Sequence, residues 1–185
     1  MRRVRERTEQ DSDEEERMGR EGSRVVHTID PVFDAQSRVL VLGTMPSPAS
    51  RAAGFYYGHP RNRFWRVMEV LFDLPELSLA GNAERTSFLL ERRIALWDVL
   101  ASCSIAGASD ASIADPVPND MSRVLGVAPI RAVFTTGSQA TRLYRTLCPA
   151  SATHPARQLP STSPANARMR LADLVEAYRV ILDAL

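Results

Sequence analysis

The stretch RVLVLG, residues 38–43, is a short apolar run that ends in glycine. Such a run, bounded by a turn residue, is typical of a buried strand. The segment IRAVFTT, residues 130–136, has the same character and is followed by Gly137. ARQLPST, residues 156–162, predicts a last short strand, and IALWDVL, residues 94–100, predicts a strand or a strand-to-helix junction. These segments together predict a buried sheet.

Segments with helical periodicity separate the predicted strands. NRFWRVMEVLF, which begins at Asn62, places its aromatic and aliphatic residues at helical spacing. Four further helices are predicted, over residues 82–93, 120–126, 138–148 and 167–185. Strands that alternate with helices form a parallel sheet covered by helices on both faces. We therefore expect an α/β fold, a three-layer α/β/α sandwich around a short central parallel sheet.

The composition is that of an ordinary globular protein, with 44% hydrophobic and 24% charged residues among 185. Residues 1–24 differ, because they hold seven arginines and eight acidic residues and almost no large apolar side chain. Such a segment cannot bury enough surface to offset the chain entropy that it would lose on ordering. We expect a disordered charged tail over residues 1–24 and a single domain over residues 25–185.

The same composition bounds the compartment and the cofactors. No stretch of 18 apolar residues is present, and the arginine-rich start lacks the apolar core of a secretory signal. The two cysteines, Cys103 and Cys148, are too few for a disulfide scaffold and lie in no zinc-binding pattern. We expect a cytoplasmic monomer that contacts no membrane and needs neither a metal nor another cofactor.

All 23 basic residues are arginine, and the chain has no lysine. It therefore lacks the side-chain amine that forms Schiff bases. Residues 25–185 carry 16 arginines and 14 acidic residues, a net charge of +2. A nucleic-acid partner would thus depend on local rather than overall positive charge.

Three segments follow predicted strands at the edge where the carboxyl ends of the strands meet: residues 43–62, 102–115 and 160–169. In open parallel sheets the ligand crevice lies beyond that edge, so we expect the functional residues in these segments. The first is preceded by VLVL and begins GTMP, which is similar to the start of a dinucleotide site. However, the pattern G-x-G-x-x-G is absent and no predicted helix follows directly.

The first of these loops also carries the motif of a known family. GTMPSPASRAAGFYYGHPRNRFW, residues 43–65, resembles the first motif of the uracil-DNA glycosylase superfamily, above all of its hypoxanthine-DNA (deoxyinosine) glycosylase branch. LWDVLASCSIAGASDASI, residues 96–113, is similar to the middle segment of that branch, and LPSTSPANA, residues 159–167, matches its closing motif. One departure is Ser47, which stands where the family has glycine.

The resemblance implies a monofunctional DNA glycosylase that hydrolyses the bond between hypoxanthine and its sugar in base excision repair. Its partner would be DNA containing deaminated bases, and no cofactor is implied. Two alternatives stay open. The first is a glycosylase of the same superfamily that prefers uracil or xanthine, and the second is a nucleic-acid-binding module without catalysis.

The resemblance also suggests a catalytic residue. In many members of the superfamily the catalytic polar residue lies two positions after the glycine of the first loop, which is Met45 here, and methionine can neither ionise nor donate. The hypoxanthine branch places this duty on the asparagine of P-x-N-x-F-W, which is Asn62. A carboxamide can hold a water with its carbonyl and donate to a base with its NH2 group. An asparagine before an apolar helix is also typical of an N-cap, so both roles are open.

A flipped base needs a ring to lie on and polar groups at its edge. We expect Tyr57 to be that ring, with Tyr56 as the alternative, while Phe64 and Trp65 follow the core-facing spacing of their helix. The remaining base-binding candidates come from the first loop and from the middle segment, and they are Gly43, Thr44, Met45, Pro46 and Asp110.

DNA contacts are expected from the first and third loops, because arginines and hydroxyls there can bind phosphates. The candidates are His59, Arg61, Arg63, Ser161, Thr162, Ser163 and Arg168. The alternatives are an exposed loop position for the histidine and a solvated helix start for Arg61 and Arg63. Met169 fits the buried first turn of the last helix, and Asp98, in an apolar run, fits a structural buried carboxylate.

Overall fold

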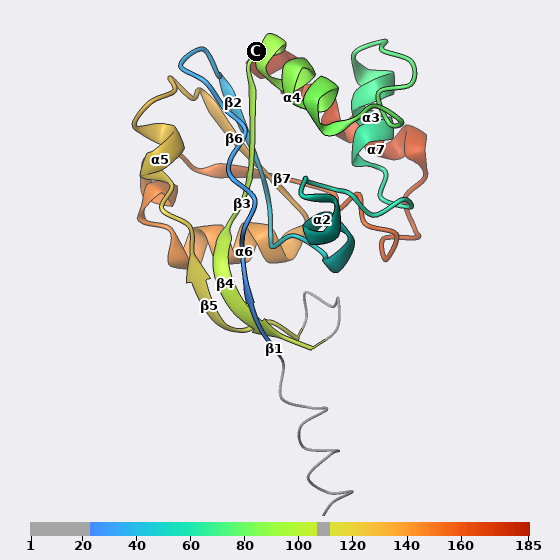
Figure 1. Ribbon diagram of the computed structural model, residues 1–185. Helices are drawn as coiled ribbons and strands as arrows, with labels where there is room; N and C mark the ends of the chain where they lie inside the picture. The colour runs from blue at the N-terminus through green and yellow to red at the C-terminus, as the bar shows by residue number, and fades with distance from the viewer. Residues whose placement is uncertain (1–22, 107–111) are drawn as a thin grey trace, which may run out of the picture.

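A computed structural model describes residues 23–106 and 112–185 of the chain (Figure 1). Its centre is a four-stranded parallel sheet in the order β3-β2-β6-β7. The strands are β2 (Val39–Gly43), β3 (Ile94–Asp98), β6 (Ala132–Thr136) and β7 (Ala156–Leu159). Every residue of β2 and β3 is buried, as expected for strands that are covered on both faces. All four predicted strands of the sheet are confirmed, and IALWDVL begins as a strand.

Helices cover both faces of this sheet (Figure 1). The helices α3 (Phe64–Leu71), α4 (Asn82–Glu91) and α7 (Leu171–Tyr178) lie on one side, and α6 (Ser138–Leu147) lies on the other. Short elements complete the layers: α2 (Pro48–Ala53), α5 (Ser122–Leu125) and the 3₁₀ turns η2 (Pro149–Ala152) and η3 (Arg179–Ala184). The expected α/β sandwich is confirmed.

A second sheet was not predicted. Strands β1 (Ser23–Val26), β4 (Leu100–Ile105) and β5 (Ala114–Pro118) pair antiparallel in the order β1-β4-β5. The expectation of a loop over residues 102–115 is therefore wrong at both ends. Ser23 and Arg24, which the composition assigns to the charged tail, belong to β1.

The chain passes from the parallel sheet to the second sheet at Val99. The carbonyl groups on either side of it, those of Asp98 and Leu100, each accept a hydrogen bond of 3.0 Å from the side-chain NH2 group of Asn119. The backbone N–H of Val99 donates to the carbonyl of Gly43 at 2.9 Å. One amide thus fixes the crossing between the two sheets, at the carboxyl end of β3.

Replacing this amide should destabilise the fold. We predict that Asn119→Ala lowers the free energy of unfolding by roughly 1–3 kcal/mol, because two buried carbonyls lose their donor. Urea denaturation would measure the change. Asn82→Ala is a matched control, since the exposed Asn82 side chain donates once, to the carbonyl of Ala53. Equal stability of the two variants would contradict the role given to Asn119.

Candidate active site

A cavity of about 370 Å³ lies at the carboxyl ends of the parallel strands. Gly43, Asp98 and Thr136 end β2, β3 and β6 and line it. Ile105 of β4 also lines it, and the rest of the lining comes from the first and third predicted loops, including Tyr57, Asn62, Ser161, Thr162 and Ser163. The two loops therefore meet where the rule for open parallel sheets expects a ligand. Asp110 lies outside the described residues.

Tyr57 has the surroundings of a stacking platform. Its ring lies parallel to that of Phe64, with ring centres 4.0 Å apart and an angle of 14° between the planes. Its hydroxyl group lies 3.1 Å from the hydroxyl of Thr136, on β6. The backbone of Tyr57 has φ 54°, a left-handed conformation that is strained for a residue with a Cβ. The ring is thus held from one face and from its tip, while the side chain lines the cavity.

Tyr56 belongs to the core instead. It is 2% exposed, and its hydroxyl donates to the backbone carbonyls of Ile29 and Asp30. Burial, and to a smaller degree the charge of Asp98, raise the pKa of the Tyr56 hydroxyl well above its ordinary value. A buried, tethered ring cannot accept a base on its face, so of the two tyrosines Tyr57 is the one placed to do so. Phe64 and Trp65 are buried, as their spacing predicts.

Asn62 is held by its carbonyl oxygen. This oxygen accepts hydrogen bonds from the backbone N–H of Phe64 at 2.9 Å and from the hydroxyl of Thr162 at 2.8 Å. A backbone N–H can only donate, so the bond to Phe64 fixes which end of the carboxamide is the oxygen. Both lone pairs of the carbonyl are engaged, which differs from the expectation that this oxygen holds a water. The NH2 group has no partner among the described residues and is the part of Asn62 left for a ligand.

Arg63 and Thr162, two of the predicted phosphate contacts, form hydrogen bonds between the first and third loops of the protein itself. The guanidinium of Arg63 donates to four backbone carbonyls of the third loop, those of Thr162, Ser163, Asn166 and Met169. The guanidinium N–H groups that make these bonds are therefore occupied by the protein itself. Thr162 is 1% exposed, and its hydroxyl serves Asn62. Both residues join the first loop to the third, which gives them a structural role, and their role in phosphate binding stays a prediction.

The other predicted DNA contacts stay open to solvent. Arg61 and Arg168 are exposed, and His59 accepts a hydrogen bond from the backbone of Arg61 with Nδ1. Ser161 and Ser163 accept turn-forming bonds from backbone N–H groups and keep hydroxyl protons that can be donated. Of these residues Ser161 and Ser163 line the cavity, and the role of all five in phosphate binding stays a prediction.

The glycine of the first loop is required by a neighbouring carboxylate. Gly43 pairs with Asp98 in the parallel register of β2 and β3. A Cβ atom at Gly43 would collide with Oδ1 of Asp98. Thr44 and Pro46 are buried beside it, and Met45 is half-buried; all three line the cavity. The four predicted first-loop residues are thus brought together.

Asp98, for which the sequence favours the role of a structural buried carboxylate, also lines the cavity. It is 5% exposed and accepts a hydrogen bond of 3.0 Å on Oδ2 from Nε2 of His27. Its second oxygen, Oδ1, has no hydrogen-bond partner among the described residues. The apolar run ALWDVL does suggest burial for Asp98. Its end-of-strand position, opposite the loop glycine, is the signal that could have placed it in the site.

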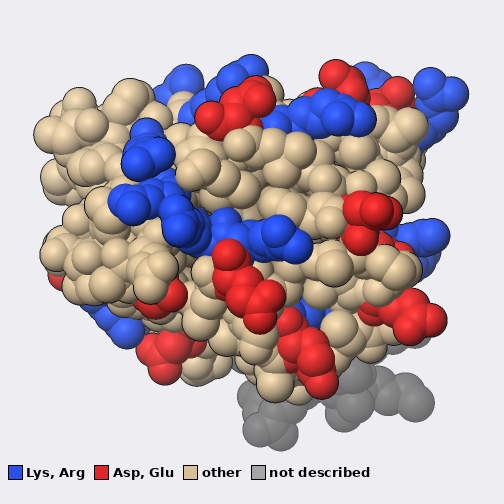
Figure 2. Space-filling view, turned by 90° about the horizontal axis from the view of Figure 1, so that it is seen from above, with Lys and Arg blue, Asp and Glu red and all other residues tan. Residues whose placement is uncertain are grey.

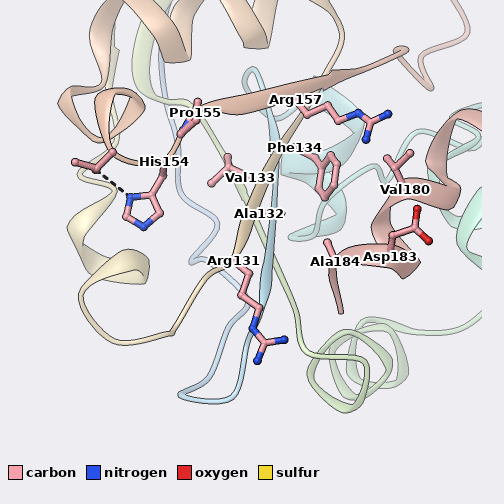
Figure 3. A pocket seen from close by; sticks show the side chains of 11 residues that line it. Arg131, Ala132, Val133, Phe134, His154, Pro155, Arg157, Val180, Asp183 and Ala184 are labelled. Carbon is pink, nitrogen blue, oxygen red and sulfur yellow. Dashed lines mark hydrogen bonds between the residues drawn. The ribbon is translucent and has the colours of Figure 1, made fainter.

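The opposite edge of the sheet is also basic. Figure 2 shows a band of arginine side chains on the face seen from above. Arg38 lies between Arg93 and Arg131 at the amino ends of neighbouring strands, joined to both through backbone hydrogen bonds of 2.7 Å. A second cavity, of about 350 Å³, lies near this edge between Arg131, His154, Arg157 and Asp183 (Figure 3). Its lining includes none of the residues that the sequence analysis selects, so the first cavity is the candidate active site.

Other kinds of site find no support in the part of the chain that the structure describes. Within residues 23–106 and 112–185, no three His, Cys, Asp or Glu side chains are gathered so that they could hold a metal ion. Within the same ranges, no helix combines the length and apolar character needed to cross a bilayer.

Comparison with known proteins agrees with this geometry. The sequence model of the Uracil DNA glycosylase superfamily matches residues 31–182, and the chain belongs to that superfamily. Two curated relatives are named hypoxanthine DNA glycosylase. The Methanosarcina acetivorans protein is 33% identical over 138 residues, 74% of this chain and 85% of the relative. The Methanosarcina barkeri protein is 32% identical over 111 residues, 60% of this chain and 70% of the relative.

A solved structure is similar as well. The solution NMR structure of a candidate uracil DNA glycosylase from Methanosarcina acetivorans superimposes with a TM-score of 0.71 and 29% sequence identity. The match covers 86% of this chain and 99% of that one. Family, relatives and fold neighbour agree that the protein is a DNA glycosylase of the uracil DNA glycosylase superfamily.

The two arginines beside Asn62 should behave differently. Because Arg63 binds four loop carbonyls, we predict that Arg63→Ala lowers the melting temperature by several degrees, equivalent to roughly 1.5–3 kcal/mol. Arg61→Ala should leave the melting temperature unchanged, because Arg61 is exposed. Arg61→Ala should instead weaken DNA binding, and the slope of the logarithm of affinity against the logarithm of salt concentration should fall in magnitude by about one. Differential scanning fluorimetry and salt titrations would measure both. A stable Arg63→Ala protein would contradict this assignment.

Proposed function

We propose that the protein is a monofunctional glycosylase that hydrolyses the N-glycosidic bond of deoxyinosine and releases hypoxanthine. The arrangement of Asn62 carries the proposal. Its carbonyl is fixed by Phe64 and Thr162, which leaves a pre-oriented NH2 donor beside a tethered aromatic ring. The names of the two curated relatives support hypoxanthine as the base.

The chemistry required is the departure of a base from a sugar that becomes cation-like. The target nucleotide must first leave the stack and enter a cavity, where its base lies on an aromatic ring. Tyr57, backed by Phe64, is the proposed ring. As the glycosidic bond breaks, negative charge grows on the base and positive charge grows on the sugar. A fixed donor at the base, the NH2 group of Asn62, lowers this barrier without having to reorganise.

Asp98 is the proposed reader of deaminated bases. Hypoxanthine carries an N–H at the ring position where adenine has an acceptor nitrogen, and uracil differs from cytosine in the same way. A carboxylate accepts hydrogen bonds and cannot donate when ionised. The unpartnered Oδ1 of Asp98 would accept this N–H and would repel the lone pair of the parent base. The chemistry favours the deaminated class, and uracil stays the second candidate because it presents the same N–H.

The catalytic role of Asn62 can be tested together with the choice of base. Labelled duplexes, each with one deoxyinosine, deoxyuridine, deoxyxanthosine or deoxyadenosine, would be incubated with excess enzyme and then treated with alkali. We predict release of hypoxanthine at the highest rate and no release of adenine. Asn62→Ala should slow excision by about 10²–10³, the loss expected for one pre-oriented donor.

Thr162→Val is the matched variant for the orientation of Asn62. It keeps the shape of the threonine but removes the hydroxyl that holds the Asn62 carbonyl. The expected slowing is about tenfold, equivalent to one hydrogen bond. Melting temperatures of both variants provide the folding control. If a folded Asn62→Ala enzyme excises at the wild-type rate, Asn62 is not catalytic, and if no base is released the protein only binds DNA.

The nucleophile should be water. The chain has no lysine, so the α-amino group is its only amine that could attack the sugar as a Schiff-base nucleophile. We predict that borohydride added during turnover traps no protein–DNA adduct and that strands break only after alkali or heat. Gel electrophoresis under denaturing conditions would resolve both products. A stoichiometric adduct that persists when residues 1–22 are removed would exclude hydrolysis.

A further inference from the structure

The segment that follows β1 places a histidine in contact with Asp98, which lines the cavity. The side chain of His27 is 2% exposed, and its Nε2 lies 3.0 Å from Oδ2 of Asp98. The backbone N–H of His27 donates to the carbonyl of Ala101 at 2.8 Å, which continues the pairing of β1 with β4. His27 precedes residues 31–182, the part of the chain that matches the superfamily model. The contact is therefore made from outside the matched region.

The hydrogen bonds of His27 define its tautomer. The backbone N–H of Ile29 donates to Nδ1 of His27 at 3.3 Å, so Nδ1 is an acceptor. The proton of the neutral ring is then on Nε2, which donates it to Oδ2 of Asp98. The pair consequently holds a neutral imidazole and a carboxylate, with the negative charge on Asp98. An imidazole that donates through Nε2 also fixes the rotation of the carboxylate.

A purely structural pair would satisfy both carboxylate oxygens, because an unpaired buried acceptor destabilises the fold. Here Oδ2 is bound to His27, whereas Oδ1 has no partner among the described residues and Asp98 lines the cavity. Oδ1 can occupy this position only because Gly43 has no Cβ. Among the described residues, the fully buried side-chain N or O atom without a hydrogen-bond partner is Nε of Arg38, so Oδ1 of Asp98 is an acceptor that a ligand can reach.

We propose that His27 is a positioning residue for base recognition, which holds Asp98 so that its free oxygen reads the N–H of a deaminated base. The proposal rests on the proposed function and adds a part of the chain that precedes the matched region. Without the imidazole donor the carboxylate would be free to turn, and Oδ1 would no longer be held where it accepts the N–H of a deaminated base and repels the lone pair of adenine. Loss of His27 should therefore reduce the discrimination between deoxyinosine and deoxyadenosine more than it reduces the affinity for DNA.

The test measures discrimination without turnover. A fluorine at the 2′ carbon of the sugar withdraws electrons and slows departure of the base, so binding to duplexes with 2′-fluoro-deoxyinosine or 2′-fluoro-deoxyadenosine can be titrated at equilibrium. The readout is the ratio of the two dissociation constants. Two variants of similar length are compared: His27→Gln, whose terminal NH2 can replace the Nε2 donor, and His27→Met, which cannot donate.

We expect the ratio to fall by roughly tenfold in His27→Met, about the discrimination that one good base contact provides, and to stay near the wild-type value in His27→Gln. Arg24→Ala is the control for β1, since Arg24 bonds to Ser102 and does not touch Asp98. This control should keep the ratio. In the Asp98→Asn background, His27→Met should cause no further loss, because the two residues act through one contact.

Equal ratios in His27→Met, His27→Gln and the wild type would overturn the proposal. So would an unchanged ratio in Asp98→Asn, whether or not the histidine variants fold. Failure of the proposed function gives a different result: the wild-type protein would release no deaminated base from cleavable duplexes and would show no preference to lose. Melting temperatures of all variants separate a loss of discrimination from a loss of structure.

Discussion

The parallel register between Gly43 and Asp98 is the constraint on which the site depends. The two residues end neighbouring buried strands, and the carboxylate occupies the space that a side chain at position 43 would fill. The backbone turns away at the same point, where the N–H of Val99 bonds to the carbonyl of Gly43 and that of Leu100 to the carbonyl of Thr44. A larger residue at position 43 would therefore displace the carboxylate, and its Cβ would also lie 3.4 Å from the hydroxyl of Tyr57.

The first and third loops are made rigid by bonds between residues about 100 positions apart. The hydroxyl of Thr162 donates a hydrogen bond to the side-chain carbonyl of Asn62, and the guanidinium of Arg63 donates to backbone carbonyls of the third loop. Tyr178 of α7 adds a bond of 2.9 Å from its hydroxyl to the carbonyl of Pro160. Such loops would otherwise be the most mobile parts of the fold. Their mutual bonds fix the orientation of Asn62, which an effective electrostatic catalyst requires.

Apolar runs and helical spacing in the sequence predicted the strands and the helix whose own residues carry that pattern. The apolar runs found the four parallel strands, and helical spacing found α3, with Phe64 and Trp65 buried. The family motif selected Tyr57 and Asn62, which the structure brings to one cavity. In contrast, β1 and β5 are exposed, with little apolar alternation to mark them, and they form only because β4 lies between them.

The contacts of Arg63, His27 and Asp98 could not be predicted from the sequence, and they share one cause. An arginine beside the motif looks the same in sequence whether it faces phosphate or four carbonyl groups, and only the position of the third loop decides. His27 and Asp98 are 71 residues apart, His27 just after β1 and Asp98 at the end of β3, so no spacing rule connects them. Contacts between residues so distant in sequence cannot be predicted from local patterns, whereas the family motif does select Tyr57 and Asn62.

The identity of the partner of Asp98 matters for the electrostatics of the proposed reaction. An arginine in the place of His27 would neutralise the carboxylate and leave the cavity without net charge. A neutral imidazole orients the carboxylate but leaves its negative charge in place. That charge would stabilise a cation-like sugar and oppose growth of negative charge on the departing base. The base therefore needs donors of its own, and the free NH2 group of Asn62 is the donor that the first loop supplies in that cavity.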